Sequence, residues 1–497
     1  MAIRLKPWLT YSATAALTLS LSLSLTGCLS SKGIEPQGNL LDANTLDTGT
    51  AIAQAKREAG WPTDQWWRAY QDPQLNQWIT LALANSPSLD EALARVREAM
   101  AMAEVTEADE KLQINYAGNS KIKHWPTDYF NGPGDLGNQT NFTSNHALGF
   151  SYVLDFWDRE KNNSARSLNQ AYASAAESRA VQLELERDIV ASYVQLALLY
   201  NQLEITQNTY EQQKHILDLA KQRLAANLGT EFEVSQASVP LPETHRQIDE
   251  YKTQIALIGN QIAALAGKGP GEAEQIKRPS ISLNAQPVLP AVLPAELIGR
   301  RPDVVARRWE VAAQARGIDV SKADFYPNIN LIASLGFDMV GGRFLDAFSH
   351  EKLGASIGPA ISLPILDGGR LRSQLRVADA QFDQAVARYN RTLVESLRQV
   401  SDQLMEIHSR EEQQHLAQQS VDAAQKSYEI ADEAYRGGLT DYLNVLQSQT
   451  MLFQQQKVQQ QVWAARLMAH ANLVCALGGG LVSSKEIPSD QHLQPNN

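Results

Sequence analysis

Cys28 carries the most specific chemistry in the sequence. It ends the motif Leu25-Thr26-Gly27-Cys28, which closes an apolar stretch over 8–25 that follows two basic residues. A basic start, an apolar run and small residues before a cleavage point are typical of a secretory signal. A cysteine thiol at that point is the soft nucleophile that accepts lipid. We expect residues 1–27 to be a lipoprotein signal peptide and Cys28 to carry covalent lipid, including palmitate. The alternative is an ordinary signal with a chance cysteine.

Other candidate chemistry is weak. Cys475 lies in an apolar run over 473–477, which predicts a packed thiol. His408, Glu411 and His415 would share a helical face like metal ligands, but a solvated face suits a stretch so rich in Gln and Glu. Residues 266–269 lack the flanking residues of a phosphate-binding loop, and no hydrolase or metalloprotease motif occurs. We therefore expect no enzyme, no catalytic residue, no metal site and no cofactor beyond the attached lipid.

The charge balance argues against nucleic acid as a partner. The chain has 44 basic and 55 acidic residues and a net charge of −11, and no basic stripe occurs. After the signal, no stretch of 18 apolar residues follows, so the sequence predicts no transmembrane helix. A membrane crossing would then require a closed β-barrel.

Two segments, Leu228-Gly229-Thr230 and Gly438-Leu439-Thr440, have the composition of tight turns. Glycine permits the left-handed conformation that reverses a helix. The turns follow two stretches without Gly or Pro, 160–228 and 371–436, which contain 69 and 66 residues. As continuous helix, each stretch would be about 100 Å long. Apolar residues in the second recur every 3.6 residues on average, which favours nearly straight helices. A tube or a long bundle is implied.

The chain also repeats itself. Pro87 and Asp109 correspond to Pro302 and Asp324, 215 positions later. Farther along, the offset is 211, and it relates Leu228, Val234 and Gln236 to Leu439, Val445 and Gln447. Each half reads as helix, strand, loop, strand, long helix, tight turn and helix, so two tandem repeats are predicted.

The strands that this pattern requires are short and alternating. Residues 328–337 and 355–363 alternate apolar and other residues, as do 112–116, and 144–153 is the expected partner strand. Gly-rich polar loops are expected over Lys121–Asn141 and Met339–Lys352. Strands of about ten residues suit a tilted membrane barrel. Two soluble hairpins are the alternative. Four strands cannot close a barrel, so a membrane location requires several chains.

Four further motifs give the chain a family resemblance. They are Arg300-Arg301-Pro302-Asp303, Asp324-Phe325-Tyr326-Pro327, Leu366-Asp367-Gly368-Gly369-Arg370 and Gly437-Gly438-Leu439-Thr440. In this order they resemble the TolC family of outer-membrane efflux proteins, in its lipoprotein branch (OprM- and NodT-like proteins). The resemblance covers nearly the whole chain after the signal.

The resemblance implies an α+β membrane protein that forms a homotrimer. Each chain would give four strands to a shared twelve-stranded outer-membrane β-barrel and long helices to a periplasmic tunnel. The Trp61–Trp67 cluster would pack in an equatorial layer. The duct would pass small molecules, such as drugs or toxic compounds, from an inner-membrane pump through a periplasmic adaptor protein. It would be lipid-anchored in the outer membrane. The other hypotheses are a lipid-anchored periplasmic helical scaffold without a pore and, more distantly, a lipoprotein hydrolase.

The resemblance also implies roles for residues near the turns. The tips Leu228, Gly229, Thr230, Gly438, Leu439 and Thr440 would contact the adaptor. Glu233, Leu443, Asn444 and Gln447 would form the periplasmic gate. Asn444 and Gln447 replace residues that are commonly acidic in related ducts, so hydrogen bonds in place of charged rings would close this gate. Ordinary polar surface residues are the alternative for all four positions.

The predicted boundaries follow from these features. They are a signal peptide (1–27), an anchor and N-terminal equatorial segment (28–84), a first repeat (85–270), a linker (271–299), a second repeat (300–477) and a C-terminal equatorial tail (478–497).

Overall fold

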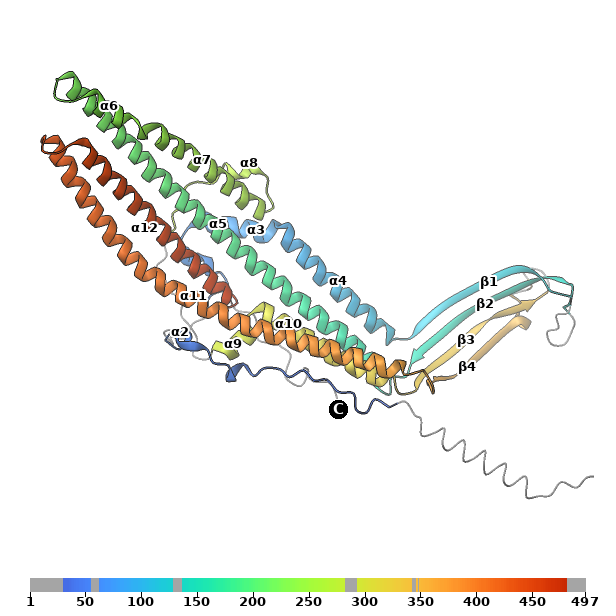
Figure 1. Ribbon diagram of the computed structural model, residues 1–497. Coiled ribbons are helices and arrows are strands. Elements are labelled where there is room, and N and C mark those ends of the chain that lie inside the picture. The colour runs from blue at the N-terminus through green and yellow to red at the C-terminus, as the bar shows by residue number, and fades with distance from the viewer. Residues whose placement is uncertain are drawn as a thin grey trace, which may run out of the picture.

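The computed structural model describes residues 30–54, 62–127, 136–281, 293–341, 346 and 348–480. Figure 1 shows long helices lying side by side over most of the length of an elongated molecule, with a sheet at one end. The chain is α+β, as predicted. Cys28, the predicted signal peptide and residues 481–497 lie outside the described residues.

Two helices of unusual length form the frame. These are α5 (Arg159–Ala225) and α11 (Arg370–Arg436), with 67 residues each, so each is about 100 Å long. Both start beside an aspartate. The carboxylate of Asp155 accepts the N–H groups of residues 159 and 161, and that of Asp367 accepts those of residues 369 and 371. These bonds satisfy amides of the first helical turn that have no partner within the helix. The two long helices that the sequence predicted are confirmed.

The internal repeat is confirmed at the level of whole elements. Helix α4 (Pro87–Asp109) and helix α10 (Pro302–Ala323) begin 215 positions apart. Strands β1 and β3 begin at 113 and 328, which is the same offset. Helices α5 and α11 begin 211 positions apart, and so do α6 (Glu231–Ser238) and α12 (Tyr442–Ala476). The change in offset falls within the sheet, where the two loops differ in length.

The two hairpins differ in the arm that returns from the tip. Helix α12 runs unbroken for 35 residues. Its counterpart is split between α6 and α7 (Pro240–Leu265), with Pro240 at the first position of α7. Proline has no N–H and cannot bond the preceding turn, so one helix hydrogen bond is missing there, although Val239 between α6 and α7 keeps helical backbone angles. The sequence reading had expected one continuous helix in this arm.

The remaining helical elements are short. They are η2 (Ala43–Thr45), α2 (Gly49–Gln54), η3 (Trp66–Tyr70), α3 (Pro73–Asn85), α8 (Pro270–Ala273), α9 (Leu293–Arg300) and η5 (His350–Lys352). Two of them, α8 and α9, lie at the ends of the segment that was expected to be only a linker. Among the described residues, no helix combines the length and the apolar character needed to cross a membrane.

The sheet has four antiparallel strands in chain order. They are β1 (Gln113–His124), β2 (Thr140–Val153), β3 (Asn328–Val340) and β4 (Leu353–Ser362). All four predicted strands are present. The predicted loops were too long, because β1 and β2 continue to 124 and 140, and β3 continues to 340. Most of the extra pairs, such as Lys121 with Thr143 and Lys123 with Asn141, are polar, and the one apolar pair, Ile122 with Phe142, is too isolated to give an alternating pattern.

The register divides the sheet into an apolar face and a polar face. Paired residues of one face are mostly aromatic or aliphatic; they include Ile114, Tyr116, Leu148, Phe150, Leu335, Ile357 and Ile361. Paired residues of the other face are mostly polar; they include Asn115, Asn119, Lys121, Asn145, Asp338, Ser334 and Ser356. Strands β1 and β4 form the two edges, and each pairs on one side only within the chain.

A central core joins the helices at mid-length. Buried side chains of η3, α3, α5, α7 and α12 pack together, including Trp66, Trp67 and Tyr70. The predicted packing role of this tryptophan cluster is confirmed for Trp66 and Trp67, whereas Trp61 lies outside the described residues. Cys475 packs against the same core, and burial raises the pKa of its thiol to about 12. The predicted packed thiol is confirmed.

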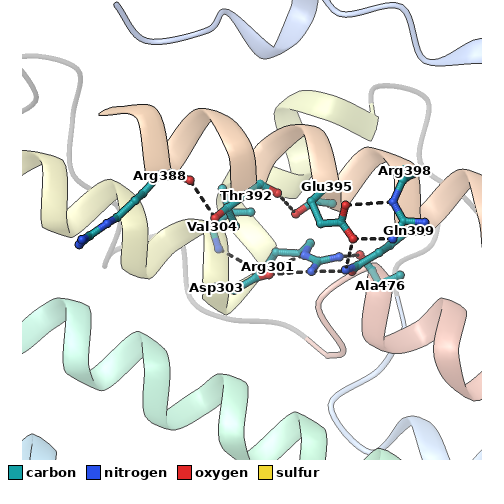
Figure 2. Close-up of polar contacts among 10 residues, drawn as sticks. Arg301, Asp303, Val304, Arg388, Thr392, Glu395, Arg398, Gln399 and Ala476 are labelled. Atoms are coloured by element: carbon teal, nitrogen blue, oxygen red, sulfur yellow. Dashed lines mark hydrogen bonds and ion pairs between the residues drawn. The ribbon is translucent and has the colours of Figure 1, made fainter. Parts of the chain in front are cut away.

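A buried arginine ties the second repeat to this region (Figure 2). Arg301 is 7% exposed. Its guanidinium donates to the Ala476 carbonyl at 2.9 Å, to Gln399 Oε1 at 3.0 Å and to the Asp303 carboxylate at 2.9 and 2.6 Å. These partners belong to α12, α11 and α10. One side chain therefore holds the start of α10 against two other helices.

Candidate functional site

Both hairpin tips lie at the end of the molecule that is farthest from the sheet (Figure 1). At the first tip, the N–H of Leu228 donates to the carbonyl of Arg223 at 2.8 Å. At the second, the N–H of Leu439 donates to the carbonyl of Ala434, also at 2.8 Å. Each of these hydrogen bonds joins the sixth residue of a segment to the first. This bond is the mark of a Schellman motif, which requires one residue in the left-handed conformation.

The two tips meet that requirement with different residues. Gly438 has a φ of 70° at the second tip, as predicted, but Asn227 has a φ of 58° at the first. Gly229 was expected to make the turn, and this expectation is wrong. A Cβ at Gly229 would lie 2.9 Å from Glu233 Oε2 and 3.3 Å from the Leu224 N atom. Glycine avoids crowding at this position, and the left-handed conformation falls to Asn227, a residue type that tolerates it.

The helices that leave the tips begin with equivalent caps. Thr230 Oγ1 accepts the N–H of Glu233 at 3.3 Å, and Asp441 Oδ1 accepts the N–H of Asn444 at 3.2 Å. Side-chain oxygens at this position satisfy amides that the first turn leaves without partners. The two tips are thus the same structure built from different residues.

A small apolar cluster joins the two hairpins just behind the tips. It contains Ile216, Ala220, Ala237, Tyr435, Tyr442 and Val445. The rings of Tyr435 and Tyr442 are 6.0 Å apart, and the Arg223 guanidinium lies 5.1 Å from the Tyr435 ring centroid. Arg223 also donates to the Leu228 carbonyl at 3.2 Å. It therefore connects the first turn to the second hairpin.

This tyrosine pair is buried without hydrogen bonds to other described residues. Both phenol oxygens lack a partner there, and burial raises the pKa of Tyr442 to about 12. Sequence reasoning missed Tyr435, Tyr442 and Arg223. A usable signal existed, because the two tyrosines flank the glycine turn on both sides, whereas the equivalent positions of the first repeat carry Leu224 and Glu231.

The predicted gate residues do not form one group. Leu443, Asn444 and Gln447 are all exposed on the first two turns of α12, and Leu443 is 43% exposed. Asn444 Nδ2 donates to Thr440 Oγ1 at 2.7 Å and is held against its own turn. Glu233 lies on the other hairpin, half-buried, with Oε2 shielded beside Gly229.

The tips present large apolar side chains to solvent. Leu228 is 69% exposed and Leu439 is 85% exposed. Phe232 and Val239 nearby are 73% and 71% exposed. Four such side chains at one end of a chain are a concentration that marks interaction surfaces.

The N-terminal segment, residues 30–46, forms a strap along α11 toward the sheet (Figure 1). Asp383 Oδ1 accepts the N–H groups of Gln37 and Gly38 at 2.9 and 2.6 Å. Near the first turn of α11, Arg372 donates to the carbonyl of Ser30. The described chain thus begins where α11 meets the sheet, two residues after the predicted lipid attachment site.

The described ranges contain no group of three or more His, Cys, Asp or Glu side chains placed to hold a metal ion. Of the three residues that resembled ligands in the sequence, Glu411 and His415 line a polar groove together with Arg466, which lies 3.9 Å from the Glu411 carboxylate. A cation on that face would meet the positive charge of Arg466.

Comparisons with known proteins agree with this architecture. The family described as outer membrane efflux protein matches residues 78–268 and 293–479, one stretch for each repeat. The chain is 49% identical to the fusaric acid resistance protein FusA of Burkholderia cepacia over 373 residues, which are 75% of this chain and 70% of FusA. It is 31% identical to the pyoverdine export outer membrane protein OpmQ of Pseudomonas aeruginosa, over 85% of this chain and 88% of OpmQ.

Among solved structures, the outer membrane protein VceC of Vibrio cholerae superposes with a TM-score of 0.79 at 31% identity. The match covers 84% of this chain and 100% of VceC. The sequence resemblance to outer-membrane efflux channels is therefore confirmed. This chain belongs to the outer membrane efflux protein family.

Proposed function

We propose that three copies of this chain form the exit duct of an export system in the bacterial outer membrane. The duct passively conducts small molecules that an inner-membrane pump delivers through a periplasmic adaptor. The observation that most directly supports this proposal is a sheet with one apolar and one polar face, attached to helices about 100 Å long. The apolar face suits lipid, and the polar face suits a water-filled interior.

The open edges of the sheet support a shared, closed structure. In hydrocarbon, the unpaired groups of β1 and β4 would be costly, so β1 of one copy would pair with β4 of the next. Two copies would close eight strands, whose interior is filled by side chains. Three copies would close twelve strands and leave a conduit. This argument favours the trimer that the family resemblance implied.

The lipid anchor at Cys28 remains part of the proposal. The described strap begins at Ser30, which Arg372 holds where the sheet ends. Two residues span only about 7 Å. A lipid on Cys28 would therefore reach the membrane surface beside the sheet.

The hairpin tips are the proposed docking surface for the adaptor. Their exposed leucines lie at the end opposite the sheet, which is the end that would point toward the inner membrane. Leu228, Gly229, Thr230, Gly438, Leu439 and Thr440 would make this contact, and Phe232 would extend it.

The gate is proposed to lie at the same end. Leu443 and Gln447, exposed on one face of α12, would meet their counterparts in other copies. Asn444 would steady the turn through Thr440. The Arg223–Tyr435 contact, which joins the hairpins within one chain, would have to shift if the hairpins separate on opening.

For cargo, the relative named for fusaric acid resistance supplies the first candidate. We propose that fusaric acid is among the exported compounds. Cells with and without the chain, each also carrying the neighbouring pump and adaptor, would be compared for growth in fusaric acid. Equal tolerance would remove this cargo and leave the duct proposal standing.

Planar-bilayer recording tests the duct itself. Purified protein should run as a heat-modifiable trimer and show single-channel current once the gate is opened or the adaptor is added. A stable trimer that never conducts under either condition would identify a helical scaffold without a pore.

The gate assignment has its own test. Replacing both Asn444 and Gln447 with alanine should raise basal conductance several-fold, because the turn loses the bond from Asn444 and the gate loses the hydrogen bonds proposed for Gln447 between copies. Ser448→Ala, on the adjacent position of α12, serves as the matched control. Unchanged conductance in the double variant would move the gate away from these residues.

A further inference from the structure

A row of side chains on α11 holds the strap, residues 30–46. Asp383 accepts two strap N–H groups, those of residues 37 and 38. Asn390 accepts the N–H of residue 41 at 2.9 Å and donates to the carbonyl of residue 39, also at 2.9 Å. Arg372 donates to the carbonyls of residues 30 and 32. Positions 372, 383 and 390 lie on one face of the helix, so this face is the docking surface of the strap.

Asp379 lies in the same row, between Arg372 and Asp383, but takes no part in these bonds. It is 5% exposed, and neither of its carboxylate oxygens has a hydrogen-bond partner among the described residues. Burying an ionised carboxylate without a donor is costly, whereas a protonated carboxyl can itself donate a hydrogen bond. The row therefore contains one side chain that suits the docked strap best when it is protonated.

The charges around Asp379 favour the same form. Asp383 on α11 and Glu35 on the strap are negative, and Lys322 on α10 is positive. Burial and then the charge of Asp383 raise the pKa of Asp379; Glu35 adds to this effect, and Lys322 opposes it without cancelling it. Glu35 is beside Asp379 only while the strap is docked, and docking also removes the carboxylate from water. The docked state therefore holds the proton more tightly than the released state.

We propose that the strap is a proton-dependent clasp, closed when Asp379 is protonated and loosened when Asp379 is ionised. On closing, the carboxylate takes up one proton from water and donates it in a hydrogen bond to a strap carbonyl, and its repulsion of Glu35 disappears. Docking then strengthens as the pH falls through the titration of Asp379 and weakens as the pH rises. Asp383 acts in the opposite sense, because its ionised form accepts the strap amides.

A loosened clasp changes the reach of the N-terminus. Residues 30–41 would be freed, and their extended length is about 40 Å. A lipid on Cys28 would then hold the chain by a slack tether, whereas the closed clasp fixes the attachment point beside the sheet. The inference concerns docking of the strap alone and does not require the chain to conduct.

Hydrogen exchange of the full-length protein in detergent tests the clasp. Protection factors at residues 37, 38 and 41, corrected for the pH dependence of intrinsic exchange, would be compared at about pH 7.5 and about pH 5. We expect protection in the parent to rise at least about three-fold on acidification, as about a ten-fold difference in proton affinity between the docked and released states would produce. Equal or lower protection at the acidic pH would overturn the inference, because Asp383 alone would give that result.

Three variants identify the titrating group. Asp379→Asn is neutral at both pH values and keeps a donor, so its strap should be protected equally at both, and no less than the parent's at about pH 7.5. Glu35→Gln should raise protection at about pH 7.5 and reduce the pH dependence. Asp422→Asn is the matched control, because Asp422 is exposed on the same helix but closer to the hairpin tip. It should respond to pH as the parent does.

Protection within α12 serves as the folding control and should be the same in every variant. With the fold intact, a pH response in Asp379→Asn as large as that of the parent would place the titrating group elsewhere and overturn the inference.

Discussion

Arg301 shows how much of the central region depends on one side chain. It is buried and bonds three helices at once. Arg301→Gln would leave the Asp303 carboxylate and the Ala476 carbonyl without their partner, at a cost of about 2–3 kcal/mol. Thermal unfolding in detergent should show a lower Tm. Arg398→Gln, at an exposed ion pair with Glu395, should change stability by less than about 1 kcal/mol.

His470 should make stability depend on pH. It is 5% exposed and lies 3.2 Å from the Tyr70 hydroxyl, and burial, together with the positive charge of Arg466, lowers the pKa of His470 to about 4. The neutral ring is the folded form, so its contribution is complete above about pH 6.5 and is lost as the pH falls toward 4. The loss should approach about 3 kcal/mol.

Comparing His470→Gln with the parent isolates this contribution from other titrating groups. The variant should lose less stability than the parent between pH 7 and pH 4, whereas His408→Gln, at an exposed position, should follow the parent. Parallel curves for all three proteins would contradict the assignment.

At the residue scale, the sequence predicted positions better than contacts. Gly438 was placed correctly, because a left-handed turn has a strong compositional signal. The role predicted for Gly229 was wrong, since Asn227 adopts the left-handed conformation of the turn and Gly229 avoids crowding. Tyr435 and Arg223 were missed, because their contact joins segments more than 200 positions apart, and the tyrosines beside the glycine turn do not indicate which residue they meet.

The hairpin tips are the elements whose geometry is most easily perturbed. Gly438→Ala would force a side chain into the left-handed conformation, which costs about 1 kcal/mol, whereas Gly437 has helical backbone angles. We expect hydrogen exchange at residues 435–442 to accelerate about five-fold in Gly438→Ala. Gly437→Ala should exchange as the parent does. Equal exchange in both variants would show that the turn tolerates the strain.

Long elements were predictable because a long helix requires many consecutive residues without Gly or Pro. The Gly- and Pro-free stretches gave α5 and α11 to within a few residues, and the repeat offsets match the element starts. The predicted strand ends were wrong, since polar pairs such as Lys123 with Asn141 continue the ladder and leave Ile122 and Phe142 as an isolated apolar pair. The break before α7 was readable from Pro240 but was obscured by the expectation of equal repeats.

At the scale of the whole molecule, two independent attachments to the membrane are proposed, the shared sheet and the lipid. Cys28→Ala should abolish labelling with radioactive fatty acid and leave the trimer and its conductance unchanged, because every described helix and strand lies after residue 42. Labelling that persists would place the lipid elsewhere. Loss of the trimer would show that the anchor takes part in assembly.

The split between α6 and α7 has a mechanical consequence. A helix with all its hydrogen bonds, such as α12, resists bending along its whole length, whereas the bond that Pro240 cannot donate leaves the joint between α6 and α7 easier to bend. The two hairpins of one chain would then differ in stiffness, although they occupy equivalent places in the internal repeat. A force applied evenly at the tips would bend the first hairpin more than the second. A trimer has six hairpins, and only the three that contain Pro240 would bend readily.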